Sequence, residues 1–272
     1  MNINETEMRP VALTIAGFDP SGGAGVIADI QTFTAFDCLA TAAVTSLTFQ
    51  NSSGVFGASH QTAEAVRAQV LPLIEEFRIA CVKTGMLPTR EIVSEVARLF
   101  RETALPAPVV DTVIRSTSGY DLIDVEALDA LVKELFPLSR LVTPNIPEAE
   151  RITGLRITDT DGMLQAARSI RRMGARAVLI KGGHLERRDE GKGMRDEERD
   201  EAIDVLDDDG RVSVFRGGWI EETTARSTRG TGCTLAAATA AGLAHGHDLE
   251  TAIAAAKRFV ELRIKAVLST EC

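Results

Sequence analysis

Hydrophobic positions along the chain follow two alternating patterns. Short runs rich in β-branched residues predict buried strands at residues 11–17, 42–49, 80–86, 108–114, 140–145 and 177–183. Between them, apolar residues recur at helical spacing and predict amphipathic helices at residues 62–77, 89–103, 125–136 and 159–173. Strands that alternate with helices are joined by right-handed crossovers, so the helices cover both faces of a parallel sheet. The pattern therefore predicts an α/β fold.

Two segments interrupt this alternation. Residues 186–201 carry mixed charge and almost no apolar side chain, so we expect an exposed charged loop, either a solvated insertion without a role or a flap beside the strand at 177–183. Residues 202–219 contain two alternating runs around Asp-Asp-Asp-Gly, which predict an antiparallel hairpin at a sheet edge. The interior contains no linker-like stretch, so we expect one domain over residues 11–268, after a disordered tail of residues 1–10.

Composition narrows the class of protein. The 272 residues are 44% hydrophobic and 25% charged, which suits an enzyme with a large core, and the net charge of -9 argues against a nucleic-acid partner. No apolar stretch reaches the roughly 18 residues of a membrane span, and the start is polar. We expect a cytoplasmic protein without a membrane partner. Its four cysteines lie far apart in the sequence. We therefore expect neither a zinc site nor a disulfide framework.

Polar or glycine-rich sequence follows every predicted strand of the parallel sheet. These stretches are residues 17–25, 50–54, 84–86, 111–119, 143–150 and 181–184. Ligands of open α/β sheets bind outside the carboxyl ends of the strands. Gly, Asn and Asp also occur in loops for conformational reasons alone, so any one stretch is compatible with a simple turn. Their repetition at successive strand ends favours a small-molecule site.

The stretch RGTGCTLAAATAAGLAHG, residues 229–246, places a cysteine where a helix begins. The start of a helix is electropositive and favours a phosphate or a thiolate, although Cys233 could also be a small packing residue. Cys38 and Cys81 fall in packed segments and read as core residues, and Cys272 is at the chain end. His245 and His247 flank Gly246, which indicates a helix terminus rather than a metal pair.

Several of these motifs together resemble a known family. The runs AGFDPSGGAG, SLTFQNSSG, KTGML, LVTPNIPEAE, VLIKGGH and RGTGCT occur in the order found in the hydroxymethylpyrimidine/phosphomethylpyrimidine kinases of thiamine biosynthesis, across residues 11–266. DPSGGAG together with GTGC is specific to this branch of the ribokinase-like superfamily. The resemblance implies a ribokinase-like fold, a homodimer, and an ATP- and Mg²⁺-dependent kinase that phosphorylates the pyrimidine alcohol and then its monophosphate.

The resemblance also implies roles at the phosphate end of the site. Backbone amides of Gly230, Thr231 and Gly232 would form an anion hole, and Cys233 would be the base for the substrate hydroxyl, its pKa lowered by the helix N-terminus. For Mg²⁺ it points to Glu148 and Asp111, and for the nucleotide to Asn145, Lys181, Ser227 and Thr228. Asn-Ile-Pro-Glu also suits a helix start, and both roles can hold at once.

For the pyrimidine, the resemblance points to Asp19 and Gln50, with Gly17, Val44, Met86 and Val113 as the surrounding wall. A carboxylate or amide can pair with the edge of an aminopyrimidine, although Asp19 can instead open an Asx turn. Phe18, Thr112, Arg115 and Arg229 depart from the residues usual in the family. These departures leave a pyridoxal or pyridoxine kinase as an alternative.

The third hypothesis is a non-catalytic pyrimidine-binding protein. The GTGC and NIPE motifs together argue against it. For the expected homodimer, the polar hairpin edge near Val205 is the candidate surface.

Overall fold

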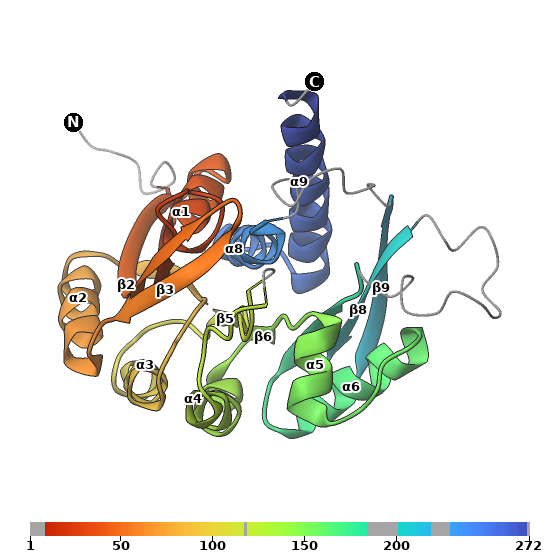
Figure 1. Ribbon diagram of the computed structural model, residues 1–272, viewed down its shortest axis with the longest axis horizontal. Helices are drawn as coiled ribbons and strands as arrows, with labels where there is room; N and C mark the ends of the chain where they lie inside the picture. Colours follow the sequence, from red (N-terminus) through yellow and green to blue (C-terminus); the bar gives the residue numbers. More distant parts are fainter. Residues whose placement is uncertain (1–8, 117–118, 184–200, 219–228, 271–272) are drawn as a thin grey trace.

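The computed structural model describes residues 9–116, 119–183, 201–218 and 229–270. Within these ranges, nine strands form one sheet in the order β3-β2-β1-β4-β5-β6-β7-β8-β9 (Figure 1). The strands are β1 (Val11–Phe18), β2 (Leu39–Asn51), β3 (Gly54–His60), β4 (Ile79–Thr84), β5 (Val109–Val110), β6 (Leu141–Val142), β7 (Ala177–Lys181), β8 (Glu201–Asp208) and β9 (Arg211–Gly218). Six neighbouring strands run parallel: β2, β1, β4, β5, β6 and β7. This confirms a mostly parallel central sheet.

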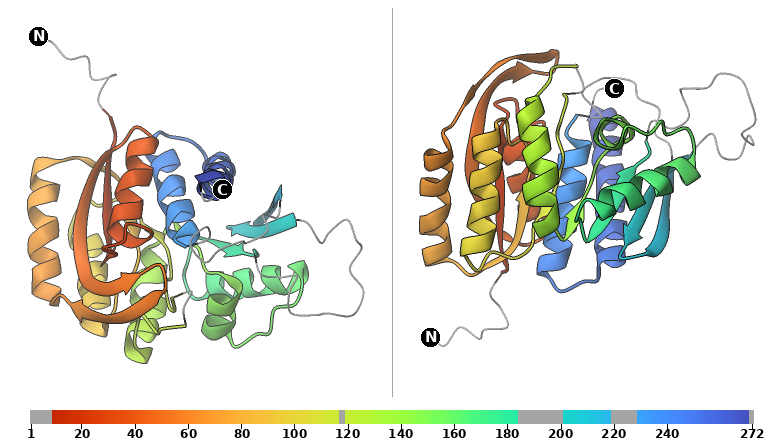
Figure 2. Two further views of the ribbon diagram at one scale, coloured as in Figure 1. Left: turned by 45° about the horizontal axis from the view of Figure 1, so that its top comes forward. Right: turned by 90° about the horizontal axis from the view of Figure 1, so that it is seen from below.

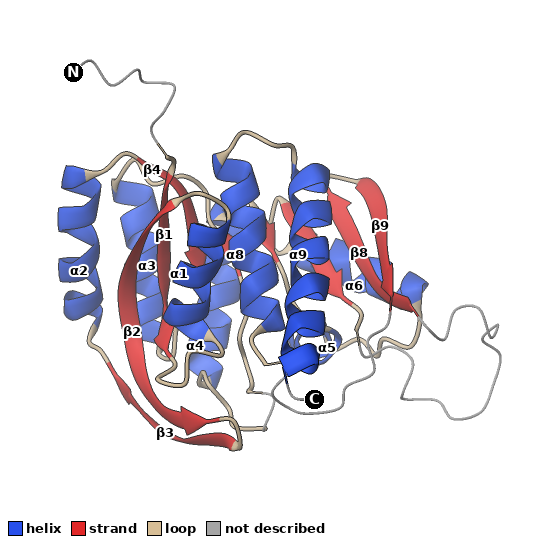
Figure 3. Ribbon diagram, turned by 90° about the horizontal axis from the view of Figure 1, so that it is seen from above, coloured by secondary structure: helices blue, strands red, loops and turns tan. Residues whose placement is uncertain are grey.

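Helices cover both faces of the sheet, as the hydrophobic pattern predicts (Figures 2 and 3). One layer consists of α2 (Ala63–Glu76), α3 (Arg90–Glu102), α4 (Val125–Ala130), α5 (Ile146–Thr153) and α6 (Thr160–Arg172). The other consists of α1 (Gly25–Ala35), α8 (Thr231–Ala244) and α9 (Leu249–Thr270). Each layer packs its own apolar core against the sheet. The helix predicted at 125–136 continues beyond α4 as a π-helical turn, Leu131–Leu135, and a 3-10 turn, Phe136–Leu138.

Side-chain caps fix where the predicted helices begin. Thr62, Thr89, Asp124 and Asp159 each accept a hydrogen bond from the backbone N–H three residues on, at the starts of α2, α3, α4 and α6. Such a cap satisfies one of the backbone donors that a helix start leaves unpaired and contributes about 1 kcal/mol. The local sequence thus determines these boundaries without help from the rest of the fold.

The two edges of the sheet are antiparallel. At one edge, β8 and β9 form the predicted hairpin, and at the other, β3 pairs with β2 in an arrangement that the pattern did not predict. The expectation of a surface near Val205 is wrong, because β8 lies between β7 and β9 and Val205 is only 1% exposed. The outer strand of the hairpin is β9, and Trp219 lies outside the described residues.

The N-terminal boundary of the predicted domain needs adjustment. Arg9 forms an ion pair with Asp37 at 2.8 Å, and the Leu39 N–H donates to Pro10 O, so these two residues belong to the fold rather than to the tail. Residues 1–8 and 186–200 lie outside the described ranges, and Glu201 begins β8. Among the helices described, none combines the length and apolar character needed to cross a membrane.

The central strands β5 and β6 are much shorter than the runs that predict them. Only Val109 and Val110 of residues 108–114 pair with neighbouring strands, and only Leu141 and Val142 of residues 140–145 are in a strand. The remainder of each run leaves the sheet at its carboxyl edge. These segments therefore form the walls of a cavity instead of extending the sheet.

Candidate active site

A cavity of about 380 Å³ lies at the carboxyl ends of the parallel strands. It collects most of the predicted site residues: Gly17, Asp19, Gln50, Met86, Asp111, Val113, Asn145, Glu148, Lys181, Gly230, Thr231, Gly232 and Cys233. Val44 does not line it; its backbone N–H donates to the side chain of Gln69 on α2. Ser227 and Thr228 lie outside the described residues.

The predicted anion hole is the N-terminus of α8. Gly230 is the N-cap and has a φ of +73°, and its carbonyl accepts the first helical hydrogen bond, from the Thr234 N–H. A Cβ on Gly230 would lie 1.9 Å from the carbonyl oxygen of Gly23, so only glycine permits this close approach of the two glycine-rich loops. The electropositive N-terminus of α8, with the backbone donors of its first turn, thus faces the cavity.

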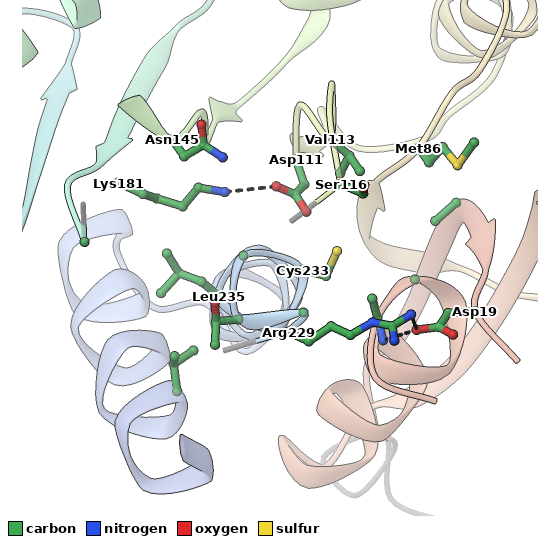
Figure 4. A pocket seen from close by; sticks show the side chains of 18 of the residues that line it. Asp19, Met86, Asp111, Val113, Ser116, Asn145, Lys181, Arg229, Cys233 and Leu235 are labelled. Atoms are coloured by element: carbon green, nitrogen blue, oxygen red, sulfur yellow. Dashed lines mark hydrogen bonds and ion pairs between the residues drawn. The ribbon is translucent and has the colours of Figure 1, made fainter. Parts of the chain in front are cut away.

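Cys233 lies in this first turn, and its thiol points away from the helix toward the space between Asp111 and Met86 in Figure 4. The expectation that the helix start lowers its pKa is wrong. The pKa of the Cys233 thiol is raised to about 12, chiefly by burial; Lys83 acts to lower it, and Asp111 and Asp29 act to raise it. The thiol is therefore protonated at neutral pH.

Asp111 and Lys181 meet beside the start of α8. Their carboxylate and ammonium groups lie 3.1 Å apart, and Lys83 lies 4.0 Å from the other oxygen of Asp111. Burial raises the pKa of Asp111, but the two lysines outweigh burial and hold it below its ordinary value. A Cβ on Gly232 would come within 3.0 Å of Lys181 Nζ, so the second glycine of GTG makes room for the ammonium group.

Asn145 and Glu148 form a capping box at the start of α5. The Asn145 side chain accepts from the Glu148 N–H, and the Glu148 carboxylate accepts from the Asn145 N–H, both at 2.9 Å. Glu148 also accepts hydrogen bonds from the Thr112 hydroxyl and the Ile114 N–H. The helix-start role inferred for Asn-Ile-Pro-Glu is therefore confirmed, and Glu148 in addition connects α5 to the segment that follows β5.

The wall that the resemblance assigns to the pyrimidine is tightly shaped. Val113 has a φ of +32°, a strained conformation for a β-branched residue. A Cβ on Gly17 would lie 3.0 Å from the Met86 sulfur, which accounts for glycine opposite methionine. The Gln50 side chain is half-buried at the end of β2, and no hydrogen bond ties it to the parts of the protein that are described. Its amide is available to a ligand.

Asp19 adopts the alternative role, as the opener of a turn. Its carboxylate accepts hydrogen bonds from the Ser21 N–H and hydroxyl, from the Ala24 N–H and from Arg229. Arg229 also donates to the Asn51 carbonyl, and its ion pair with Asp19, at 3.0 Å, is visible in Figure 4. The Arg229 guanidinium therefore holds the start of α8 against the loop after β1 and the end of β2.

Two charged pairs that sequence reasoning missed also reach the cavity. Lys83 on β4 is completely buried and pairs with Asp29 on α1 at 2.8 Å. Lys257 on α9 pairs with Asp204 on β8 at 2.6 Å, and both residues line the cavity. A signal for Lys83 was present, because it is the one charged residue within the apolar run of residues 79–86. Nothing local distinguishes Lys257 from other helix lysines.

The acidic groups fit a cation that is shared with a ligand rather than one held by the protein alone. Within the described ranges, no cluster of three or more Asp, Glu, His or Cys side chains could enclose a metal ion. Asp111 offers a carboxylate beside two ammonium groups, and the oxygens of Glu148 already accept three hydrogen bonds. Mg²⁺ commonly binds through one or two carboxylates plus substrate phosphates and water, which is compatible with this arrangement.

Comparison with known proteins identifies the fold's relatives. The sequence pattern of phosphomethylpyrimidine kinases matches residues 19–271. The chain belongs to the phosphomethylpyrimidine kinase family. It is 41% identical over 260 residues to the hydroxymethylpyrimidine/phosphomethylpyrimidine kinase of Rhizobium meliloti, covering 95% of this chain and 92% of that protein. It is 40% identical to the thiamine biosynthesis bifunctional protein ThiED of Geobacter sulfurreducens, which it matches over 94% of its own length but only 49% of that protein.

Solved structures place this family member among ribokinase-like kinases. The phosphomethylpyrimidine kinase of Clostridium difficile 630 is similar with a TM-score of 0.79 and 34% identity, covering 94% of this chain and 100% of that one. The pyridoxal kinase of Staphylococcus aureus, in complex with AMP-PCP and pyridoxal, is similar with a TM-score of 0.79 and 28% identity, covering 93% of this chain and 87% of that one. The expected phosphotransferase class and ribokinase-like fold are confirmed.

Proposed function

We propose that this family member transfers a phosphoryl group from ATP to the CH₂OH of 4-amino-5-hydroxymethyl-2-methylpyrimidine, and then phosphorylates the monophosphate. The observation that carries the proposal is the start of α8, where Cys233 and an anion-binding turn lie between the Lys181–Asp111 pair and the wall containing Gly17 and Met86. Phosphoryl transfer requires the acceptor hydroxyl and the transferring phosphoryl group to meet at one point. This turn supplies a proton acceptor for the hydroxyl and backbone donors for the phosphoryl group.

The acceptor hydroxyl is oriented by the pyrimidine wall. The free amide of Gln50 pairs with the exocyclic amine and ring nitrogen, while Met86 and Val113 contact the ring. With the CH₂OH directed at the start of α8, the thiolate form of Cys233 accepts the hydroxyl proton while the hydroxyl oxygen bonds to the γ-phosphorus of ATP and the bond from that phosphorus to the ADP leaving group breaks. A high pKa makes the thiolate rare at neutral pH but strongly basic. Phosphoryl transfer depends mainly on positioning and charge stabilisation, so a late proton transfer is sufficient.

The charge on the transferring group is balanced by donors from three elements. Backbone N–H groups of Gly232 and Cys233 lie in the first turn of α8, and Lys181 reaches the same point from the end of β7. Asp111 and Glu148 would hold Mg²⁺, directly or through water, together with the nucleotide phosphates. When bound, Mg²⁺ would supply further charge neutralisation for the phosphates. Asn145 lies beside Lys181 through a backbone bridge and completes the nucleotide side.

An ADP-release assay tests the proposal directly. We expect ADP release with the pyrimidine alcohol and with its monophosphate, each dependent on Mg²⁺, and a diphosphate product by mass spectrometry. Release with the alcohol alone would remove the second step from the proposal. If no ADP were released with either pyrimidine, the proposal would be overturned. Pyrimidine binding without ADP release would favour the non-catalytic alternative.

A pyridoxal kinase is the second candidate function. The likeness to the S. aureus pyridoxal kinase structure extends over 93% of this chain, and pyridoxal also carries a CH₂OH on a six-membered nitrogen ring. Pyridoxal in the same assay discriminates between the two. A kcat/KM for pyridoxal that exceeds the value for the pyrimidine would make this the preferred function.

We further propose that the protein is a cytoplasmic homodimer. Cys38, Cys81 and Cys233 are free thiols, which suits a reducing compartment. The surface best suited to a second copy is the β2–β3 ribbon, where Leu47, Phe49 and Phe56 are 43%, 55% and 68% exposed. Light scattering coupled to size exclusion should give a mass near twice 29.2 kDa, and Phe56→Ser should reduce it. A monomeric wild-type protein would exclude the dimer.

A further inference from the structure

One arginine in the cavity wall carries a charge that the neighbouring carboxylate does not balance. Arg115 follows β5 and lines the cavity, and its side chain is 59% exposed. Its Nε donates to Asp121 Oδ1 at 3.1 Å, and Arg151 on α5 donates to the same oxygen at 3.0 Å. Two guanidinium groups thus share a single carboxylate, which leaves a net positive charge at this wall.

The other cations of the cavity are matched one to one with carboxylates. Within the described ranges, these pairs are Lys83 with Asp29, Lys181 with Asp111, Arg229 with Asp19, and Lys257 with Asp204. All four pairs are largely buried. The pair of Arg115 with Asp121 is exposed, and such a pair contributes little free energy and separates readily. Arg115 is therefore the cavity cation best able to take up an anion.

The guanidinium of Arg115 presents its donors in a form that suits phosphate. Its two terminal NH₂ groups have no hydrogen-bond partner in the part of the chain that the structure describes. An arginine binds phosphate through two parallel hydrogen bonds, each of which is stronger than a bond between neutral groups. The NH₂ groups are thus open to a phosphate while Nε stays on Asp121.

Arg115 belongs to the side of the cavity that would receive the acceptor. In Figure 4, Val113 and Ser116 lie together in the wall proposed for the pyrimidine. Asp111 separates them from Lys181, which would contact the nucleotide. Arg115 directly precedes Ser116 in the chain and lines the cavity together with Val113. Its charge therefore lies nearer to the acceptor than to the nucleotide.

The two acceptors of the proposed reaction differ in charge. The CH₂OH of the pyrimidine alcohol is neutral, whereas a phosphate monoester carries roughly −1.5 to −2 charge at neutral pH. One oxygen of that phosphate must reach the start of α8 to be phosphorylated, and its other oxygens remain available to a cation. A cavity that accepts both compounds needs a positive charge that only the second one uses.

We propose that Arg115 is a specificity-determining residue that binds the phosphate of the pyrimidine monophosphate and contributes little to binding of the alcohol. The inference rests on the proposed function and explains how one cavity serves both of its steps. The surplus charge at the Arg115–Asp121–Arg151 group and the open NH₂ groups of Arg115 carry it.

Equilibrium binding tests the proposal without catalysis. Isothermal titration of the full chain with the monophosphate and with the alcohol, without ATP, compares the wild type with Arg115→Met. We expect monophosphate binding to weaken roughly 10- to 100-fold, as for lost charge-assisted hydrogen bonds, and alcohol binding to change by less than about twofold. Arg115→Lys should be intermediate, because lysine keeps the charge but not the paired donors. An unchanged affinity for the monophosphate would overturn the proposal.

Two further variants separate contact with the phosphate from other effects of the substitution. Asp121→Asn releases Arg115 from its carboxylate, so the monophosphate should bind at least as tightly as to the wild type. A loss as large as that in Arg115→Met would assign the effect to the structure of the loop, against the proposal. Arg98→Met on α3 removes an arginine of similar exposure, 53%, that does not line the cavity. If it weakened monophosphate binding equally, net charge alone would be responsible and the proposal would be wrong.

Steady-state kinetics distinguish this inference from the proposed function. In Arg115→Met, the KM for the monophosphate should rise while the KM for ATP stays constant. A higher KM for ATP with both acceptors would assign Arg115 to the nucleotide and overturn the proposal. If the wild type bound the monophosphate but released no ADP with it, the second step of the proposed function would fail. Titration would still decide whether Arg115 binds the phosphate.

Discussion

The Thr112 hydroxyl donates a 2.6 Å hydrogen bond to the Glu148 carboxylate, and both side chains are buried. The same carboxylate accepts from the Ile114 N–H at 3.1 Å, so Glu148 holds the chain on both sides of Val113. Val113 is the residue with the strained φ of +32° in the cavity wall. A side chain at the start of α5 thereby maintains a backbone conformation in the proposed pyrimidine wall, which connects the two ends of the cavity.

Thr112→Val should loosen this wall. Removing one of two hydrogen bonds that hold Val113 should cost about 1–3 kcal/mol of unfolding free energy, because the charged acceptor stays buried. Relaxation of Val113 should also raise the KM for the pyrimidine more than the KM for ATP. Denaturant unfolding and steady-state kinetics measure these effects. Thr143→Val is a matched control, since Thr143 is equally buried but makes only a long 3.4 Å hydrogen bond. Equal KM changes in both variants would contradict the coupling.

Glu148→Gln separates the capping role from the proposed metal role. The amide keeps the shape but cannot accept from three donors as the carboxylate does, so the melting temperature should fall. If Glu148 also helps to hold Mg²⁺, kcat should fall and recover in part as the Mg²⁺ concentration is raised. A lowered melting temperature with no response of kcat to Mg²⁺ would restrict Glu148 to its structural role.

Gln50→Ala should affect recognition of the pyrimidine. The wild-type amide has no protein partner in the described structure, so its loss leaves no buried group unsatisfied and folding should be unaffected. We expect a higher KM for the pyrimidine, a nearly constant KM for ATP and an unchanged melting temperature. Isothermal titration with the pyrimidine alone checks the binding step. An unaltered pyrimidine affinity would remove Gln50 from the binding site.

Cys233→Ala should reduce kcat by roughly 10²- to 10⁴-fold, the usual contribution of a positioned proton acceptor. Binding of both substrates and the melting temperature should persist, because the anion hole is formed by backbone groups. Cys233→Asp should restore part of the lost rate by supplying a carboxylate base. Near-normal kcat in the alanine variant would show that Cys233 is a packing residue and that transfer depends on the anion hole and metal alone.

The pH dependence of Cys233 reactivity follows from its raised pKa. With a pKa of about 12, the thiolate fraction in the unliganded protein increases about tenfold per pH unit from pH 7 to 10, without a plateau. Iodoacetamide rates at Cys233 should follow this slope. A plateau below pH 9 would mean an ordinary or lowered pKa. The pyrimidine should protect Cys233, and Cys38 should react more slowly because its side chain is almost fully buried, whereas Cys233 lines the cavity.

Much of the site was predictable because its residues lie in local motifs. The run RGTGC carries a helix start, its glycines and its thiol within five positions, and Asn145 and Glu148 sit at the spacing of a capping box. Lys83 was overlooked because a charged residue inside an apolar run conflicts with the simple pattern of a buried strand. Its partner Asp29 is 54 residues away, and no local rule connects them.

The expectations that were wrong concern properties of the environment rather than of the segment. The helix N-terminus by itself lowers the pKa of a cysteine, but in the fold the burial of Cys233 and the nearby Asp111 carboxylate outweigh that effect. Likewise, Val205 lies in a hairpin as predicted, but which of its two strands forms the edge depends on pairing with β7.

By itself, the sequence determined the α/β alternation, the helix caps, the hairpin and the glycine-rich turn at the start of α8, because periodicity, caps and glycine conformations act within a few residues. Only the tertiary structure decided the lengths of β5 and β6, the pairing of Lys83 with Asp29, the strain at Val113 and the protonation of Cys233. These depend on which distant groups share a low-dielectric interior, where desolvation and charge pairing are decided by contacts that no local window of sequence contains.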